Sequence, residues 1–104
     1  MKVKNQKESK RSEFRKNKTT EHPAYIFAKI GNKYKYIGLT HSEITDGVRN
    51  IKLDKNPNPK DKSTAYARTK TEQARTNDFK QKEKAWKFSK SDKEEINKII
   101  KKNN

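Results

Sequence analysis

The segment AYIFAKIGNKYKYIGLT, residues 24–40, constrains the fold of this chain more than any other part of the sequence. It contains two runs rich in Tyr, Ile and Phe, and the pair Gly31-Asn32 separates them. Such a pair favours a two-residue turn between antiparallel strands. The sequence therefore predicts a β-hairpin whose strands cover residues 24–30 and 33–40.

The predicted turn also fixes which residues lie opposite each other. Counting outward from it gives the pairs Ile30 with Lys33, Phe27 with Tyr36, Ile26 with Ile37, and Ala24 with Leu39. Because side chains alternate along a strand, the hairpin has two faces. We expect a core face made of Ala24, Ile26, Ala28, Ile37 and Leu39. The opposite face is aromatic and basic, and is made of Tyr25, Phe27, Lys29, Tyr34 and Tyr36.

This aromatic and basic face has two interpretations, which the sequence leaves open. Exposed rings can stack on unpaired bases while lysines hold phosphates, and on that interpretation Tyr34 is the most exposed ring. Alternatively, the C-terminal helix or Trp86 and Phe88 cover the face. A chain with 27% hydrophobic residues has few other groups from which to build a core. We expect Trp86 itself to be a core residue.

Weaker patterns complete the predicted fold. Residues 50–53 and 63–68 favour short strands, and residues 69–84 favour a loop or a poorly anchored helix. A helix is predicted over residues 91–102, because Ser91 and Glu94 form a capping box and an apolar stripe follows them, made of Ile96, Ile99 and Ile100. The predicted fold class is α+β, a small antiparallel sheet packed by a C-terminal helix.

The N-terminal residues 1–20 contain few apolar side chains and no helical periodicity. We expect a disordered basic arm there, which either lies along a phosphate backbone or is simply solvated. The rest of the chain, residues 22–104, is expected to form a single α+β domain.

The charge of the chain indicates the chemistry of its partner. The formal net charge is +15, which favours a polyanion such as RNA, DNA or an anionic membrane surface. Of these, we expect nucleic acid, and RNA rather than DNA. A lysine-rich surface that only increases solubility is the alternative. The residues expected to contact nucleic acid are Lys29, Lys33, Tyr34, Lys35, Tyr36, Arg49 and Arg68.

Several other classes of protein are disfavoured. The chain has no cysteine, which excludes disulfides and thiolate metal sites. It has no apolar run of about 20 residues that would cross a bilayer. No metal-ligand spacing, phosphate-binding loop or cofactor motif is present. We therefore expect a cytoplasmic protein with no cofactor, no metal and no membrane partner.

The two histidines of the chain, His22 and His41, carry the sharpest functional hypothesis. If the hairpin ladder extends to them, the predicted register sets them directly opposite each other. Metal-free cleavage of RNA needs a base and an acid, and imidazole can serve as either near neutral pH. Thr40, Tyr36 and Tyr66 would add hydrogen bonds, and Lys29, Arg49 or Arg68 would stabilise the phosphate. The alternative is that both histidines are incidental surface residues.

In layout, residues 22–102 resemble small ribonuclease toxins of the RelE, EndoU, barnase and colicin types. The resemblance is one of residue type: a small basic chain with an antiparallel sheet carrying His, Lys, Arg, Tyr and Thr. The residues that match the EndoU-like members are His22, His41, Lys29, Thr40 and Tyr66. The chain departs from these toxins in lacking a structured N-terminal helix. It also looks like small proteins carried on bacterial mobile elements.

Three functions therefore remain as expectations. The first is a small basic protein that binds nucleic acid, RNA in preference to DNA. The second is a metal-independent, toxin-like endoribonuclease that uses the histidine pair, as the resemblance implies. The third is an interaction protein bound by an acidic protein partner such as an antitoxin.

Overall fold

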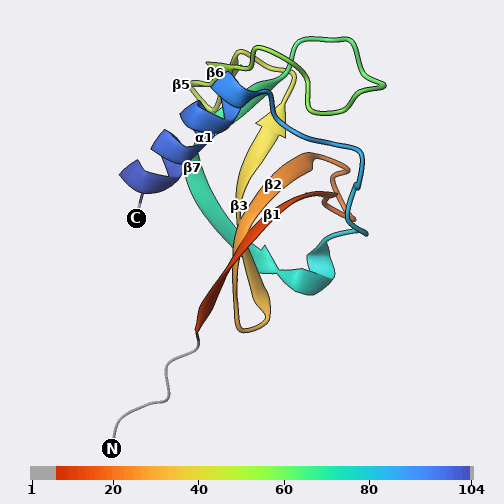
Figure 1. The fold of residues 1–104 in the computed structure, drawn as a ribbon, viewed down its shortest axis with the longest axis vertical. Coiled ribbons are helices and arrows are strands. Elements are labelled where there is room, and N and C mark those ends of the chain that lie inside the picture. The colour runs from red at the N-terminus through yellow and green to blue at the C-terminus, as the bar shows by residue number, and fades with distance from the viewer. Residues whose placement is uncertain (1–6, 104) are drawn as a thin grey trace, which may run out of the picture.

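The structure, a computed structural model that describes residues 7–103, is built on a five-stranded antiparallel sheet (Figure 1). In spatial order its strands are β1 (Glu8–Lys16), β2 (Pro23–Ile30), β3 (Lys33–Thr40), β7 (Tyr66–Arg75) and β6 (Ile51–Lys52). A second, two-stranded sheet consists of β4 (Ile44–Thr45) and β5 (Val48–Arg49). A short 3-10 helix, η1 (Thr76–Asp78), follows β7, and the helix α1 (Lys90–Lys102) packs against the sheet. The predicted α+β fold is confirmed.

The N-terminal strand β1 is the largest departure from the sequence prediction. A disordered arm over residues 1–20 is wrong for residues 8–16, which pair with β2 from Glu8↔Ile30 to Lys16↔Pro23. Residues 1–6 of that predicted arm lie outside the described residues. Strand β1 contributes one large apolar side chain to the core, Phe14, and its backbone pairs with β2 along most of its length. That pairing leaves almost no signal in the sequence.

The hairpin β2–β3 forms as predicted near its turn and departs from the prediction beyond it. Gly31 has a φ of 59°, a left-handed value that glycine adopts readily, and Ile30 pairs with Lys33. A β-bulge at Phe27 then shifts the register by one residue, so that the next pairs are Ile26↔Tyr36, Tyr25↔Ile37 and Ala24↔Gly38. The predicted pairs Phe27–Tyr36, Ile26–Ile37 and Ala24–Leu39 are therefore wrong.

The bulge redistributes the side chains between the two faces of the sheet. Tyr25, Phe27 and Ala28 join Ile37 and Leu39 in the core beneath α1. Ala24, Ile26 and Tyr34 cluster with Phe79 on the other face, and Tyr36 packs against them. The predicted division into an apolar face and an aromatic face is wrong, because each face receives both kinds of residue. Tyr34 is 7% exposed, so the prediction that it is the most exposed ring is also wrong.

Helix α1 covers one face of the sheet through the apolar stripe that the sequence indicated. Ile96 and Ile99 are buried in the core and Ile100 packs at its margin. The cap lies two residues earlier than expected, because Ser89, rather than Ser91, accepts a hydrogen bond from the Asp92 backbone N–H at 3.2 Å. No helix within residues 7–103 is long and apolar enough to cross a membrane.

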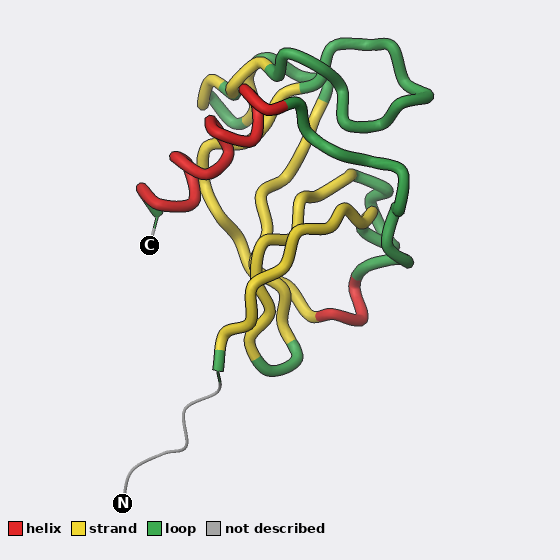
Figure 2. Tube along the Cα trace, viewed as in Figure 1, coloured by secondary structure: helices red, strands yellow, loops and turns green. Residues whose placement is uncertain are grey.

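The segment of residues 78–88, which we call the edge strap, runs along the outer edge of β1 (Figure 2). The backbone N–H of Lys80 donates to the Lys16 carbonyl and that of Glu83 donates to the Phe14 carbonyl, each at 2.8 Å. The predicted loop or helix over 69–84 is wrong for residues 69–75, which continue β7, whereas residues 80–84 lie in a loop, as one of the two alternatives predicted.

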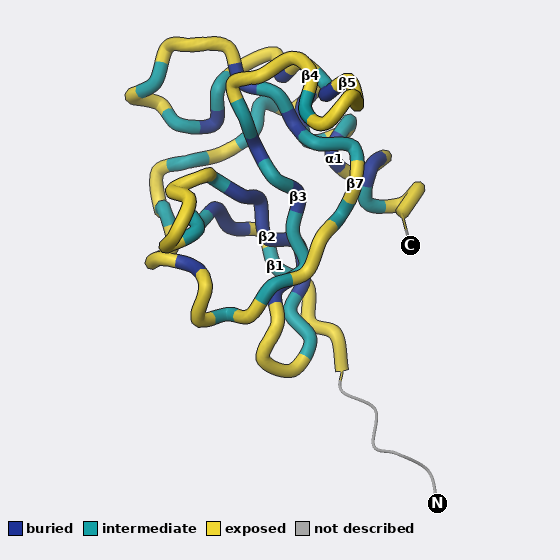
Figure 3. Tube along the Cα trace, turned by 180° about the vertical axis from the view of Figure 1, so that it is seen from behind, coloured by how far each residue is buried: buried dark blue, intermediate teal, exposed yellow. Residues whose placement is uncertain are grey.

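The edge strap also supplies aromatic side chains to both faces of the sheet. Phe79 lies on the face away from α1, with its ring 5.2 Å from that of Tyr36. Phe88 and Trp86 pack on the α1 side, at ring distances of 4.9 and 5.9 Å from Phe14. Trp86 therefore packs against the core, as expected. Figure 3 shows the buried residues concentrated along β2, β3 and the adjoining part of β1.

The buried carboxylate of Asp92 attaches α1 to the loop after β6, and its removal should destabilise the fold. It accepts hydrogen bonds from the backbone N–H groups of Asp54 and Lys55, at 2.8 and 3.0 Å, and the residue is 4% exposed. We expect Asp92→Ala to lower the free energy of unfolding by about 1–3 kcal/mol, because two donors lose their charged acceptor. Urea denaturation measures this.

The matched control removes an exposed carboxylate from the same helix. Glu94→Ala should change the free energy of unfolding by less than about 0.5 kcal/mol, as is usual for surface substitutions. Equal effects of the two substitutions would show that net charge, and not the buried contact, controls the stability.

Candidate functional site

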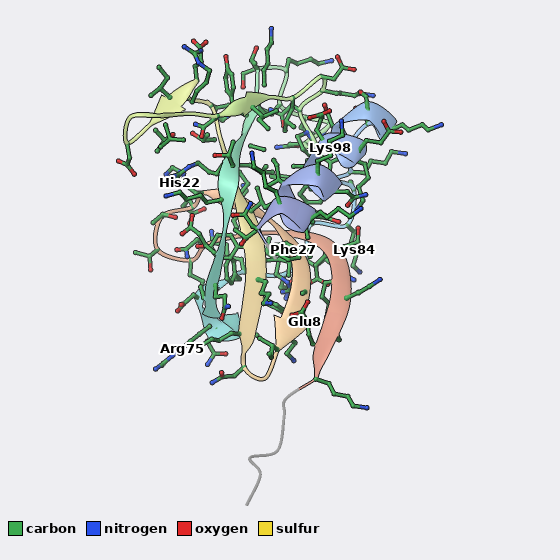
Figure 4. All side chains as sticks on the ribbon, turned by 90° about the vertical axis from the view of Figure 1, so that its left-hand side faces the viewer. Glu8, His22, Phe27, Arg75, Lys84 and Lys98 are labelled. Carbon is green, nitrogen blue, oxygen red and sulfur yellow. The ribbon has the colours of Figure 1, made fainter. Side chains whose placement is uncertain are left out.

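A pocket of about 290 Å³ opens on the face of the sheet away from α1. Its polar lining comes from separate segments: the β1–β2 turn, β3, β4 and β7. In Figure 4 the labelled His22, which lines this pocket, and Lys98 of α1 lie on opposite sides of the strands. The lining residues are Asn17, Thr20, His22, Pro23, Ala24, Tyr36, Gly38, Leu39, Thr40, Thr45, Arg68, Glu72 and Phe79.

The β1–β2 turn holds His22 at the pocket wall. Asn17 organises this turn, since its side-chain Oδ1 accepts from the N–H groups of Thr19 and Thr20 at 2.8 and 3.0 Å. The Asn17 backbone N–H donates to the His22 carbonyl at 3.0 Å. Glu21 has a φ of 64° and an ion pair of 2.5 Å to Lys80 of the edge strap. The imidazole of His22 is exposed to solvent within this fixed backbone.

Gly38 provides the space in which Arg68 lies over the sheet. A second irregularity, between β3 and β7, sets residues 68–70 of β7 opposite Gly38. A Cβ atom at Gly38 would lie 3.3 Å from Cγ of Arg68, closer than most real contacts. The absence of a side chain at Gly38 therefore lets the stem of Arg68 approach the backbone and reach the pocket.

Tyr36 and Glu72 lie opposite each other on β3 and β7, and both line the pocket. The Tyr36 hydroxyl donates to Glu72 Oε1 at 3.4 Å. Burial raises the pKa of Tyr36 above its ordinary value, the charge and hydrogen bond of Glu72 raise it further, and the charge of Arg68 lowers it. The pKa of Tyr36 therefore depends on the charges of both Glu72 and Arg68 on β7.

The pocket thus contains a cation, a carboxylate and an imidazole. Neither Arg68 nor Glu72 forms an ion pair with any residue of the described chain, whereas Lys35, Arg49 and Lys80 do. An unpaired guanidinium can bind a phosphate, and a carboxylate and an imidazole can exchange protons with a bound ligand. This combination can support acid–base chemistry on a phosphodiester.

The bulge at Phe27 also decides which residue accompanies His22. The shifted register brings Thr40, and not His41, to the pocket with His22, so the predicted opposition of the two histidines is wrong. His41 instead lies with Nε2 3.0 Å from Oδ2 of Asp61 and does not line the pocket. Hydrogen bonds from Ser63, followed by that of His41, hold the pKa of Asp61 well below its usual range.

The predicted nucleic-acid contacts are divided between the two faces. Tyr36 and Arg68 line the pocket, and Lys29, which pairs with Tyr34, shares their face. Lys33 and Lys35 alternate with Tyr34 and so lie on the opposite face. Lys35 pairs with Glu8 and Arg49 with Glu43, each at 2.6 Å.

Of the residues predicted to be catalytic, His22 and Thr40 line the pocket, whereas His41 and Tyr66 do not. Tyr66 is paired with Thr40 and half-buried beside the site.

Glu72 is the pocket residue that sequence reasoning missed most clearly. It lies in TKTEQAR, which has no periodicity strong enough to distinguish a strand from a loop. If this segment had been predicted as a strand, Glu72 and Arg68 would have been expected on one face of the sheet. Glu72 pairs with Tyr36 of β3 on that face. The signal present was the alternation of Thr69 and Thr71, both β-branched, with charged residues.

Comparisons with known proteins do not assign a role to this pocket. No protein-family model, no curated protein and no solved structure matches the chain. Within residues 7–103, no group of three or more His, Asp or Glu side chains could hold a metal ion.

The titration of Tyr36 tests the charges in the pocket without reference to any ligand. We expect Glu72→Gln to lower the pKa of Tyr36, because the substitution removes a negative charge and a charged acceptor. Arg68→Ala should raise the same pKa, because it removes a positive charge. Ultraviolet detection of tyrosinate during alkaline titration measures both shifts, and Tyr36→Phe identifies the signal. Shifts of the same sign in both variants would contradict the proposed arrangement.

Proposed function

We propose that the protein is a metal-independent endoribonuclease that binds RNA and cleaves it in the pocket lined by His22, Arg68 and Glu72. The observation that carries the proposal is that one pocket is lined by an imidazole together with a guanidinium and a carboxylate that form no ion pair within residues 7–103. The net charge of +15 supports a polyanionic substrate. We place its action in the cytoplasm, where such a substrate is abundant.

The three groups supply what the reaction requires. Glu72 takes the proton from the ribose 2′-hydroxyl, whose oxygen then forms a bond to the adjacent phosphorus. Protonated His22 donates its proton to the 5′-oxygen as the bond between phosphorus and that oxygen breaks. Arg68 stabilises the charge that develops on the phosphorane, and Tyr36 and Thr40 offer hydroxyl groups to the sugar and phosphate. The products are a 2′,3′-cyclic phosphate and a 5′-hydroxyl end.

The size of the pocket is consistent with one nucleotide rather than a duplex. Its volume of about 290 Å³ is at the lower end of the range for ligand sites. Side chains reach a 2′-hydroxyl and an in-line phosphate most easily in unpaired RNA. We therefore propose single-stranded RNA as the substrate.

Binding without cleavage is the second candidate function, and the surface charge favours it independently of the pocket. An acidic protein that covers the same basic surface is a further candidate partner, consistent with an inhibitor of a toxin. RNA binding without cleavage and binding of an acidic protein are both distinguished from catalysis by measuring the cleavage rate of variants substituted within the pocket.

The decisive test is an RNA cleavage assay in EDTA with substitutions of the two histidines. We expect His22→Ala and Glu72→Gln each to reduce the rate by roughly 10²–10⁴, the usual contribution of general acid–base catalysis. His41→Ala should leave the rate essentially unchanged, because His41 is held against Asp61 outside the pocket. The 2′,3′-cyclic phosphate is detected by mass spectrometry.

His41→Ala is the matched control, since it removes the same side chain from the same hairpin. Equal losses in both histidine variants would overturn the assignment of His22. Tight RNA binding with no cleavage by the wild type would reduce the function to binding. Absence of both, together with capture of an acidic protein, would favour the interaction role.

Salt dependence tests which cations contact phosphates. For single-stranded RNA, each phosphate contact contributes roughly 0.7 to the slope of log K against log salt. We expect Arg68→Ala to reduce the slope by about this amount. Lys35→Ala should leave it nearly unchanged, because Lys35 pairs with Glu8 and points to the other face. Fluorescence anisotropy with a 2′-deoxy-substituted, uncleavable RNA gives both slopes, and equal reductions would contradict the assignment of the binding face.

A further inference from the structure

The β4–β5 hairpin follows directly after the end of β3, as Figure 3 shows from behind. Its two-residue turn is formed by Asp46 and Gly47, with φ values of 52° and 76°. Each of its strands has two residues, which form the pairs Ile44↔Arg49 and Thr45↔Val48. Thr45 of this hairpin lines the pocket. The hairpin is therefore part of the pocket rim.

Asn50 joins the two ends of the hairpin. It is 5% exposed, its Nδ2 donates to the Ser42 carbonyl at 3.0 Å and to Thr45 Oγ1 at 2.8 Å, and its backbone N–H donates to the Glu43 carbonyl at 2.8 Å. These three bonds hold both ends of the hairpin. The rim that Thr45 contributes is preorganised rather than free to collapse into the pocket.

Pairing within the hairpin assigns its side chains to two faces. Residues directly opposite each other in an antiparallel pair share a face. Val48 is opposite Thr45, which lines the pocket, and so shares its face, although Val48 itself does not line the pocket. Ile44 is opposite Arg49 and lies on the other face of the hairpin. Val48 is 37% exposed and Ile44 is 52% exposed, and these are the exposed large hydrophobic residues of the described chain.

The exposed aliphatic side chain of Val48 offers an apolar surface to a ligand that extends beyond the pocket. A nucleobase has an apolar face that packs on such a side chain, and its sugar and phosphate would lie toward the charged groups. We propose that Val48 packs against the base of the nucleotide next to the one in the pocket, and so helps to determine which RNA sequences are cleaved. This inference rests on the proposed ribonuclease function and adds a specificity-determining residue to it.

The test is a double-mutant cycle between the protein and the RNA. Val48→Ser is combined with short RNAs in which the nucleotide on either side of the cleaved one is abasic. We expect Val48→Ser to lower kcat/KM about tenfold on intact RNA, at the lower end for loss of an apolar contact. It should have no effect on RNA that is abasic at the contacted position.

Ile44→Ser is the matched control, because it removes a more exposed aliphatic group from the other face of the same hairpin. It should leave kcat/KM unchanged on every RNA. Equal effects of Val48→Ser on intact RNA and on both abasic RNAs would overturn the inference while leaving the ribonuclease function intact. Thermal denaturation of both variants checks that the fold is retained.

The same cycle is measured by affinity on uncleavable, 2′-deoxy-substituted RNA. A wild-type protein that does not cleave would contradict the proposed function. Coupling between Val48 and one base in the affinity cycle would still support the contact. The absence of coupling would overturn it.

Discussion

The bulge at Phe27 is the constraint on which the rest of the sheet depends. One extra residue in β2 moves every pair beyond it by one position, from Ile26↔Tyr36 to Ala24↔Gly38. Without it, Tyr25 would lie on the same face as Tyr34 and Tyr36, and the core beneath α1 would lose its largest fully buried side chain. With it, the same shift removes the opposition of His22 and His41 and brings His22 and Thr40 to one pocket. A single local irregularity thus determines both the core and the site.

A chain with so few apolar residues covers a two-sided sheet by using aromatic rings on both faces. The edge strap places Phe79 on one side of β1 and Trp86 and Phe88 on the other, and its backbone pairs with the edge between them. Each ring buries a large area and two of these three make edge-on contacts with neighbours at ring distances near 5 Å. The strap also shields part of a strand edge that would otherwise be open to pairing with another chain.

The sequence predicted the features that local chemistry determines. The turn at Gly31-Asn32, the helix carried by Ile96 and Ile99, and the α+β class follow from turn preference and helical spacing. The bulge at Phe27 and the strand β1 follow from packing between distant segments, and so neither had a local signal.

The site was predictable to the same extent. His22, Thr40, Tyr36 and Arg68 were singled out by residue type, and the structure brings them together. The partner expected for His22 was wrong, because one residue of register decides it, and Glu72 was missed because its strand was not recognised. Lys33 and Lys35 were grouped with the aromatic residues although alternation sends them to the other face.

The pocket is assembled from parts of the chain that are far apart, from Asn17 to Phe79. No fragment of the protein that ends before Phe79 contains the complete lining, and pairing of such distant strands is a late and slow event in folding. During synthesis, the emerging chain therefore has no complete pocket until it extends to Phe79 and β7 has paired with β3. Any ligand that the pocket takes can therefore bind only after these distant strands have been made and have paired.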